Sequence, residues 1–136
     1  MDSDRLLFVL IFALAMGCEL HISEPAPSRG VYYLENLTED RLVVEAESPW
    51  SDPLQLTNSE VEAGETRELY SRVNDASHAP SNMFGQLTIH RETVSDETLV
   101  YSGIDNAHWV LEPGGEGGDG KPRVHYTLTI PVPSNP

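Results

Sequence analysis

The sequence predicts an all-β protein, a single antiparallel β-sandwich of about seven to eight strands. Apolar residues recur with a period of two over most of the chain, which is typical of strands with one buried face. Residues that favour turns interrupt these runs about every ten positions, as in sandwiches and barrels. After residue 18, no segment shows the 3.6-residue apolar period of an amphipathic helix.

The amino-terminal strands follow this alternation closely. Val31-Tyr32-Tyr33-Leu34 opens the first strand, and the polar segment 36–40 turns the chain. Residues 42–47 alternate apolar and polar side chains, which gives this strand one buried and one wetter face. The segment 49–53 begins and ends with proline and breaks the pattern.

The middle of the chain is more polar but keeps the same period. Leu54 and Leu56 lie two residues apart, and residues 67–69 continue the period on a more polar strand. Between them, residues 62–65 form a tight turn, because glycine at position 64 adopts positive φ without strain. We expect residues 74–82 to form a loop with a short helical turn.

The carboxy-terminal half contains the clearest strands. The first and last residues of the segment 87–89 are apolar and are expected to face inward, as are those of the segment 109–111. Between these segments, residues 95–97 form a turn that leads into a strand at 98–101. In the last strand the inward residues are Val124, Tyr126, Leu128 and Ile130, and the outward residues are His125, Thr127 and Thr129. This number of strands fits an immunoglobulin-like or similar sandwich, whose strand order the alternation does not determine.

The amino terminus contains the most specific motif of the chain. An apolar run from Leu6 ends in Leu14-Ala15-Met16-Gly17-Cys18, at the only cysteine. The run is shorter than the ~20 residues of a membrane-spanning helix and fits the centre of a secretory signal, although residues 1–5 lack the usual positive charge. The motif resembles the lipobox of bacterial lipoproteins. The resemblance implies that residues 1–17 are a signal peptide and that Cys18 becomes the lipidated first residue.

The same resemblance implies the domain organisation and the location of the protein. Residues 18–30 are rich in proline and serine and are expected to form a tether, followed by the domain at 31–133 and a tail at 134–136. A lipidated Cys18 places the chain in the cell envelope, bound to the lipid bilayer. The residue after it is Glu19 rather than aspartate, which favours the outer over the inner membrane. The succession of strands and turns is also similar to that of small envelope lipoproteins without assigned activity.

The charge excludes one class of partner. Eight lysines and arginines stand against 22 aspartates and glutamates, a formal net charge of −14. Such a surface repels nucleic acid and anionic lipid headgroups. No nucleic-acid partner is expected, whereas a cationic partner, a divalent ion or simple solubility are all compatible with the charge.

Two groups of residues are candidates for metal ligands. Residues 114–119 match the start of the calcium-binding nonapeptide Gly-Gly-x-Gly-x-Asp, in which Glu116 and Asp119 would supply oxygens. The motif occurs once, so a flexible loop between two strands is the alternative. His90 and His125 both project outward and would form a two-histidine site if their strands were neighbours. The alternative is two ordinary surface histidines.

A third candidate combines His78 with Met83, because soft thioether ligands suit copper. Nucleophilic catalysis has no support in the sequence. The chain lacks a Gly-x-Ser-x-Gly elbow, and Ser102 has no recognisable base partner. We therefore expect neither an enzyme nor a bound cofactor.

Trp50 lies between two prolines in an expected loop and is a candidate contact residue, because tryptophan is enriched at binding hot spots. The sequence thus predicts a membrane-anchored, non-catalytic envelope lipoprotein that acts as a protein-interaction or structural module. Its contact regions would be edge strands or the end loops around Trp50 and residues 112–122. The alternative is an extracytoplasmic protein that binds calcium, a transition metal or a small solute.

Overall fold

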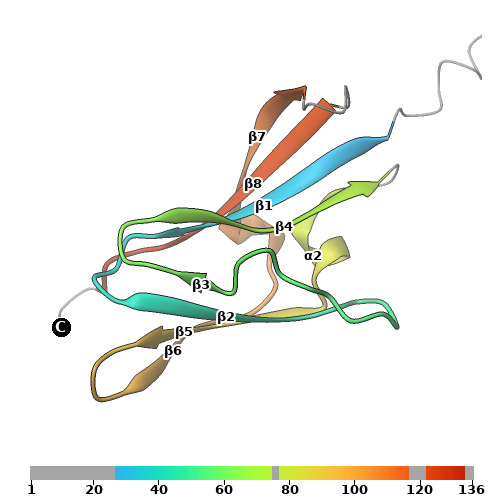
Figure 1. Cartoon of the computed structure of the whole chain (residues 1–136). Helices are drawn as coiled ribbons and strands as arrows, with labels where there is room; N and C mark the ends of the chain where they lie inside the picture. Colours follow the sequence, from blue (N-terminus) through green and yellow to red (C-terminus); the bar gives the residue numbers. More distant parts are fainter. Residues whose placement is uncertain (1–26, 75–76, 117–121, 134–136) are drawn as a thin grey trace, which may run out of the picture.

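The protein folds as a sandwich of two four-stranded sheets (Figure 1), in a computed structural model that describes residues 27–74, 77–116 and 122–133. Sheet A has the strand order β4-β1-β8-β7, and sheet B has the order β3-β2-β5-β6. The elements are, in chain order, β1 (Ser28–Asn36), β2 (Arg41–Glu47), β3 (Glu60–Val61), β4 (Thr66–Asn74), α2 (Pro80–Met83), β5 (Gln86–Glu92), β6 (Glu97–Gly103), the 3-10 turn η1 (Asn106–His108), β7 (Trp109–Glu116) and β8 (Pro122–Ile130).

The structure confirms the predicted all-β sandwich and adds its strand order. Sheet B is antiparallel throughout, whereas sheet A is mixed, because its first and last strands, β1 and β8, pair in parallel. Apolar alternation reports which face of a strand is buried but not the direction of its neighbour, so it did not predict the parallel pair. The first two strands lie in different sheets, whereas in the immunoglobulin arrangement they are neighbours in one sheet.

Three segments differ from the sequence-based expectation. The strand β1 begins at Ser28, so residues 28–30, expected in the tether, belong to the sheet. Leu54 and Leu56 pack against the core from a segment that forms no strand. The expected helical turn in 74–82 is α2, a single turn that extends to Met83.

The centre of sheet A is aromatic. Tyr32, on β1, is fully buried, and its ring lies within 6.4 Å, centroid to centroid, of four other aromatic rings. These rings belong to Tyr70, Phe84, Trp109 and Tyr126. The cluster therefore connects β1 with β4, β7, β8 and the residue after α2, in edge-to-face and stacked arrangements that aromatic pairs prefer.

The hydroxyl of Tyr32 has a defined partner inside this cluster. It donates a hydrogen bond to the carbonyl oxygen of His78, 2.5 Å away in a buried position. Burial raises the pKa of Tyr32 well above its ordinary value of 10.0, and the neighbouring Tyr126 and Tyr70 raise it further. The phenol is therefore protonated, and able to donate this hydrogen bond, at neutral pH.

A second buried polar group organises the opposite end of β1. The side-chain amide of Asn36 donates to the carbonyl oxygens of Asp40 (2.8 Å) and Val61 (3.0 Å). Its oxygen accepts bonds from the backbone N–H (2.9 Å) and the hydroxyl (2.7 Å) of Thr38. All of its hydrogen-bonding capacity is used, so one fully buried side chain fixes the turn from β1 to β2 and attaches it to β3.

We expect Tyr32→Phe to lower the free energy of unfolding by about 1–3 kcal/mol, because the buried carbonyl of His78 loses its donor. Denaturant titration measures the change. Tyr33→Phe is the matched control, since the Tyr33 hydroxyl has no hydrogen bond within the described part of the chain. Equal losses in the two variants would contradict this role of the hydroxyl.

We expect Asn36→Ala to cost about 1–3 kcal/mol of unfolding free energy or more, because several buried groups lose their partner at once. The control is Asn58→Ala, which removes a single part-buried bond to the carbonyl of Glu68 (2.9 Å). A smaller loss for Asn36→Ala than for Asn58→Ala, measured in the same titration, would refute the assignment.

Candidate functional site

The proposed calcium ligands and the lipidation site fall where the structure gives no side chains. Cys18, Asp119 and the side chain of Glu116 lie outside the described residues. The described parts of the loop are the end of β7, where Gly115 adopts a φ of 70°, and the start of β8 at Pro122. The calcium and lipid sites therefore remain predictions.

The two candidate histidines do not meet. His90 is on β5 in sheet B, paired in register with Val43 on its outer face. His125 is on β8 in sheet A, also facing outward, and packs edge-to-face against Tyr33 at 5.2 Å. Both side chains project outward, as expected, but the two outer faces lie on opposite sides of the sandwich. The strands of His90 and His125 are therefore not neighbours, which is the condition that a two-histidine site required. Within the described segments, no group of three or more histidine, cysteine or acidic side chains is placed to hold a metal ion.

His78 and Met83, the candidate copper ligands, both have packing roles in the structure. His78 is 8% exposed, and its Nε2 lies 2.6 Å from the hydroxyl of Ser28. Its Nδ1 faces Gly30, where an added Cβ would come within 2.8 Å of it. Met83 is fully buried in the core cluster. Burial lowers the pKa of His78 below its ordinary 6.5, so the neutral ring is the favoured form.

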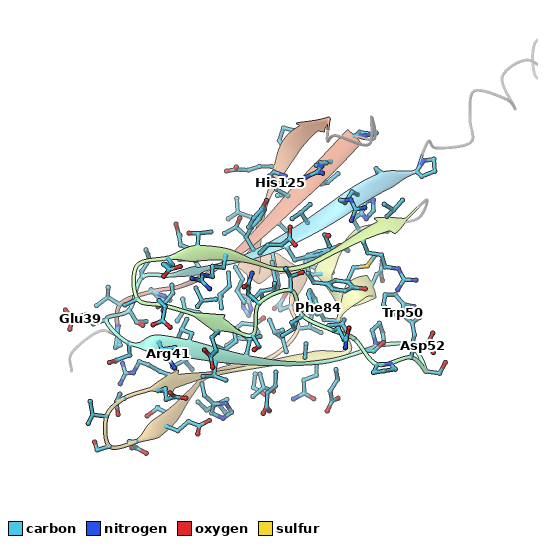
Figure 2. All side chains as sticks on the ribbon, in the orientation of Figure 1. Glu39, Arg41, Trp50, Asp52, Phe84 and His125 are labelled. Carbon is cyan, nitrogen blue, oxygen red and sulfur yellow. The ribbon has the colours of Figure 1, made fainter. Side chains whose placement is uncertain are left out.

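Trp50 lies in the loop between β2 and β3, at the end of the sandwich where β1 begins (Figure 2). Its side chain is 40% exposed. The guanidinium of Arg72, on β4, lies 4.1 Å from the centre of its ring. A cation over an aromatic face stabilises both groups, so Trp50 is a partly covered, amphipathic surface group.

Three of the exposed large apolar residues lie on two free strand edges. β6 and β7 each have one neighbour in the sheets, and so each leaves one edge unpaired among the described residues. Leu99 on β6 is 53% exposed, and Val110 and Leu111 on β7 are 58% and 56% exposed. We call these two strands, with the groove between β6 and β8, the open edge.

The groove of the open edge has a volume of about 280 Å³. Its lining residues are Val100, Tyr101, His108, Leu128, Thr129, Ile130 and Pro131. Tyr101 and His108 are joined at its rim by a contact of 3.1 Å between the hydroxyl and Nδ1. The groove is thus mainly apolar, with one polar pair at its border.

The other edges are protected against strand pairing. β3 consists of two residues, which leaves little edge for another strand. β4 carries Arg67 and Glu68 near its start, and Arg67 is paired with Glu65 at 2.6 Å. Charged side chains and short strands are usual means of blocking edge-to-edge association, and the open edge has neither over residues 99–101 and 109–111.

A sequence signal for the open edge exists, although the strand analysis did not use it. Leu99-Val100-Tyr101 and Trp109-Val110-Leu111 are uninterrupted apolar triplets in strands that otherwise alternate. An uninterrupted triplet places apolar side chains on both faces of one strand. At a sheet centre both faces can be covered, but at a free edge the triplet leaves apolar surface exposed.

Comparison of the sequence with known protein families and with curated proteins finds no match. The functional argument therefore rests on the geometry of the described residues. Among them, no helix has the length and apolar character needed to cross a membrane.

We expect acid to destabilise the protein in part through His78. The pKa of His78 is lower in the folded protein than in the unfolded chain. As the pH falls below 6.5, the unfolded chain therefore binds a proton at this histidine that the folded protein does not bind. The free energy of unfolding falls as a result. His78→Asn removes this contribution. Denaturant titrations between pH 7 and pH 5 check it: the difference in stability between wild type and variant should shrink as the pH falls. A constant difference would contradict the assignment.

Proposed function

We propose that the protein is a membrane-anchored, non-catalytic envelope lipoprotein that acts as a protein-interaction module. The observation that supports the interaction role is the open edge, whose two strands expose apolar residues where the other edges of the sandwich are short or charged. The lipid anchor is supported by the lipobox at residues 14–18.

The partner supported by this geometry is an extended peptide segment with apolar side chains. An unpaired strand edge presents backbone N–H and C=O groups to which a further strand can pair. On β7, Val110 and Leu111 point to opposite faces of sheet A. Side chains of an added strand also alternate between the two faces, so some of them would cover Val110 and others would cover Leu111. Pro113 limits the pairing segment to the first half of β7, because proline has no amide hydrogen to donate.

Leu111→Lys should reduce partner capture by about tenfold or more, since a desolvated charge at the contact costs well over 1.4 kcal/mol. To measure capture, Thr98 on β6 is replaced by a photocrosslinking residue. The yield of the crosslinked band after irradiation of the native envelope then gives the amount of partner bound. The free energy of unfolding should change little, because Leu111 is 56% exposed.

The control for this experiment is Val94→Lys, which adds the same charge at an exposed apolar residue in the turn between β5 and β6. Its crosslinking yield should equal that of wild type. Equal losses from the two variants, or an unchanged yield for Leu111→Lys, would refute the open edge as the contact. The anchor is tested separately by the mass of the amino-terminal peptide and by release of Cys18→Ser from the membrane fraction.

A further inference from the structure

One arginine lies on the inner face of the sandwich. Leu87, Ile89 and Arg91 alternate with outward-facing residues on β5, and the first two are fully buried. Arg91 is opposite Leu42 of the core in the register with β2. Opposed residues of an antiparallel pair share a face, so the side chain of Arg91 enters the space between the two sheets, where it is 24% exposed. A charged side chain is rarely placed inside a protein without partners.

The contacts of Arg91 use only part of its guanidinium. Its Nε lies 3.4 Å from a carboxylate oxygen of Asp40 and is buried without a hydrogen bond. Within the described residues, no other nitrogen of this guanidinium forms a hydrogen bond either. An arginine side chain has five N–H donors in a planar fork. Arg91 therefore has one charged neighbour and donors that remain available to a ligand.

The position of Asp40 is fixed by the turn between β1 and β2. Its carbonyl oxygen accepts a hydrogen bond from the side-chain amide of Asn36 (2.8 Å), and its N–H donates to the hydroxyl of Thr38 (3.3 Å). Asn36 and Thr38 are both buried. The carboxylate beside Arg91 is therefore held on a rigid support, and a site that is ordered before binding loses less entropy when a ligand binds.

A pocket of about 340 Å³ lies beside this ion pair, at the end of the sandwich marked by Glu39 in Figure 2. Its lining residues are Glu39, Asp40, Arg91, Val132 and Pro133. They come from the turn before β2, the end of β5 and the segment after β8. We call it the end pocket. It shares no residue with the groove of the open edge, and its volume is that of a small-molecule site.

The lining residues determine which charges a ligand needs. Arg91 provides planar donors that suit a carboxylate, whereas Glu39 and Asp40 suit an ammonium group. A simple anion would be repelled by both carboxylates and by the net charge of −14. A zwitterion has no net charge and provides both groups. The rest of the lining is apolar, with Val132 61% exposed.

We propose that the end pocket binds a small α-amino acid with an apolar side chain. The carboxylate of the ligand binds the donors of Arg91, its ammonium group binds the carboxylates of Glu39 and Asp40, and its side chain contacts Val132. Every charge of the ligand and of the pocket then has an opposite charge beside it. The end pocket is separate from the open edge, so the protein would bind this ligand whether or not a protein partner is present.

The test is an NMR titration of the isotope-labelled full chain with L-leucine. The signals of the backbone N–H of Asp40 and of the Nε–H of Arg91 report occupancy of the end pocket, and their shifts give the Kd. Two analogues of leucine each lack one charge: isoamylamine has no carboxylate, and isocaproate has no ammonium group. Each analogue should bind about tenfold or more weakly than L-leucine, because a charged group of the pocket then has no partner.

Two variants test the assigned residues. Arg91→Lys keeps the positive charge beside Asp40 but removes the planar donors, so it should weaken the binding of L-leucine by about tenfold. Glu39→Gln changes an exposed side chain, which leaves the fold intact, and should also weaken binding. The matched controls are Arg41→Lys and Glu60→Gln. These two residues form an ion pair at 3.8 Å and do not line the pocket, so both controls should bind L-leucine like the wild type.

Three results would overturn the proposal. The first is that L-leucine shifts neither the Asp40 signal nor the Arg91 signal of the wild-type chain. The second is that isoamylamine or isocaproate binds as tightly as L-leucine. The third is that Arg91→Lys and Glu39→Gln both bind L-leucine with the affinity of the controls. A partner captured at the open edge would be unaffected by any of these results, because the two sites share no residue.

Discussion

The structure depends on the position of Tyr32 in the middle of sheet A. β1 is the first strand in the described part of the chain, yet it pairs with β4 on one side and with β8 on the other. The ring of Tyr32 contacts aromatic residues on both neighbours, on β7 and after α2, and its hydroxyl bonds to the segment before α2. Because the amino terminus enters through a central strand, a force on an anchor would be resisted by two ladders and by the core.

The sequence was sufficient to predict the sandwich, because burial of one face imposes a period of two wherever a strand forms. It was insufficient to predict which strands are neighbours, since that choice depends on long-range packing. His90 and His125 illustrate both points. Their outward orientation follows from the alternation around them, but their separation on opposite faces follows from the strand order, which no local pattern contains.

The exposure of residues at the open edge could not be predicted from the sequence either. Trp109 and Leu111 lie on the same side of β7, as their spacing predicts, and both pair in register with inward-facing residues of β8. Yet Trp109 is 6% exposed and Leu111 is 56% exposed. The ends of β7 and β8 diverge from sheet B (Figure 1), so nothing from that sheet covers Leu111. Exposure at an edge depends on how far the two sheets diverge, which residue spacing does not encode.

Net charge gives a similarly incomplete description of the surface. A value of −14 predicts repulsion from any anionic surface, and this holds for a molecule that rotates freely. The described charges are nevertheless distributed unevenly over the surface. At the end where β1 finishes, Arg41, Arg67 and Arg91 are each paired with a carboxylate, whereas Arg72 lies over the ring of Trp50. The open edge carries no charged side chain over residues 99–101 and 109–111, so the net charge of the chain says little about a partner that pairs with this edge.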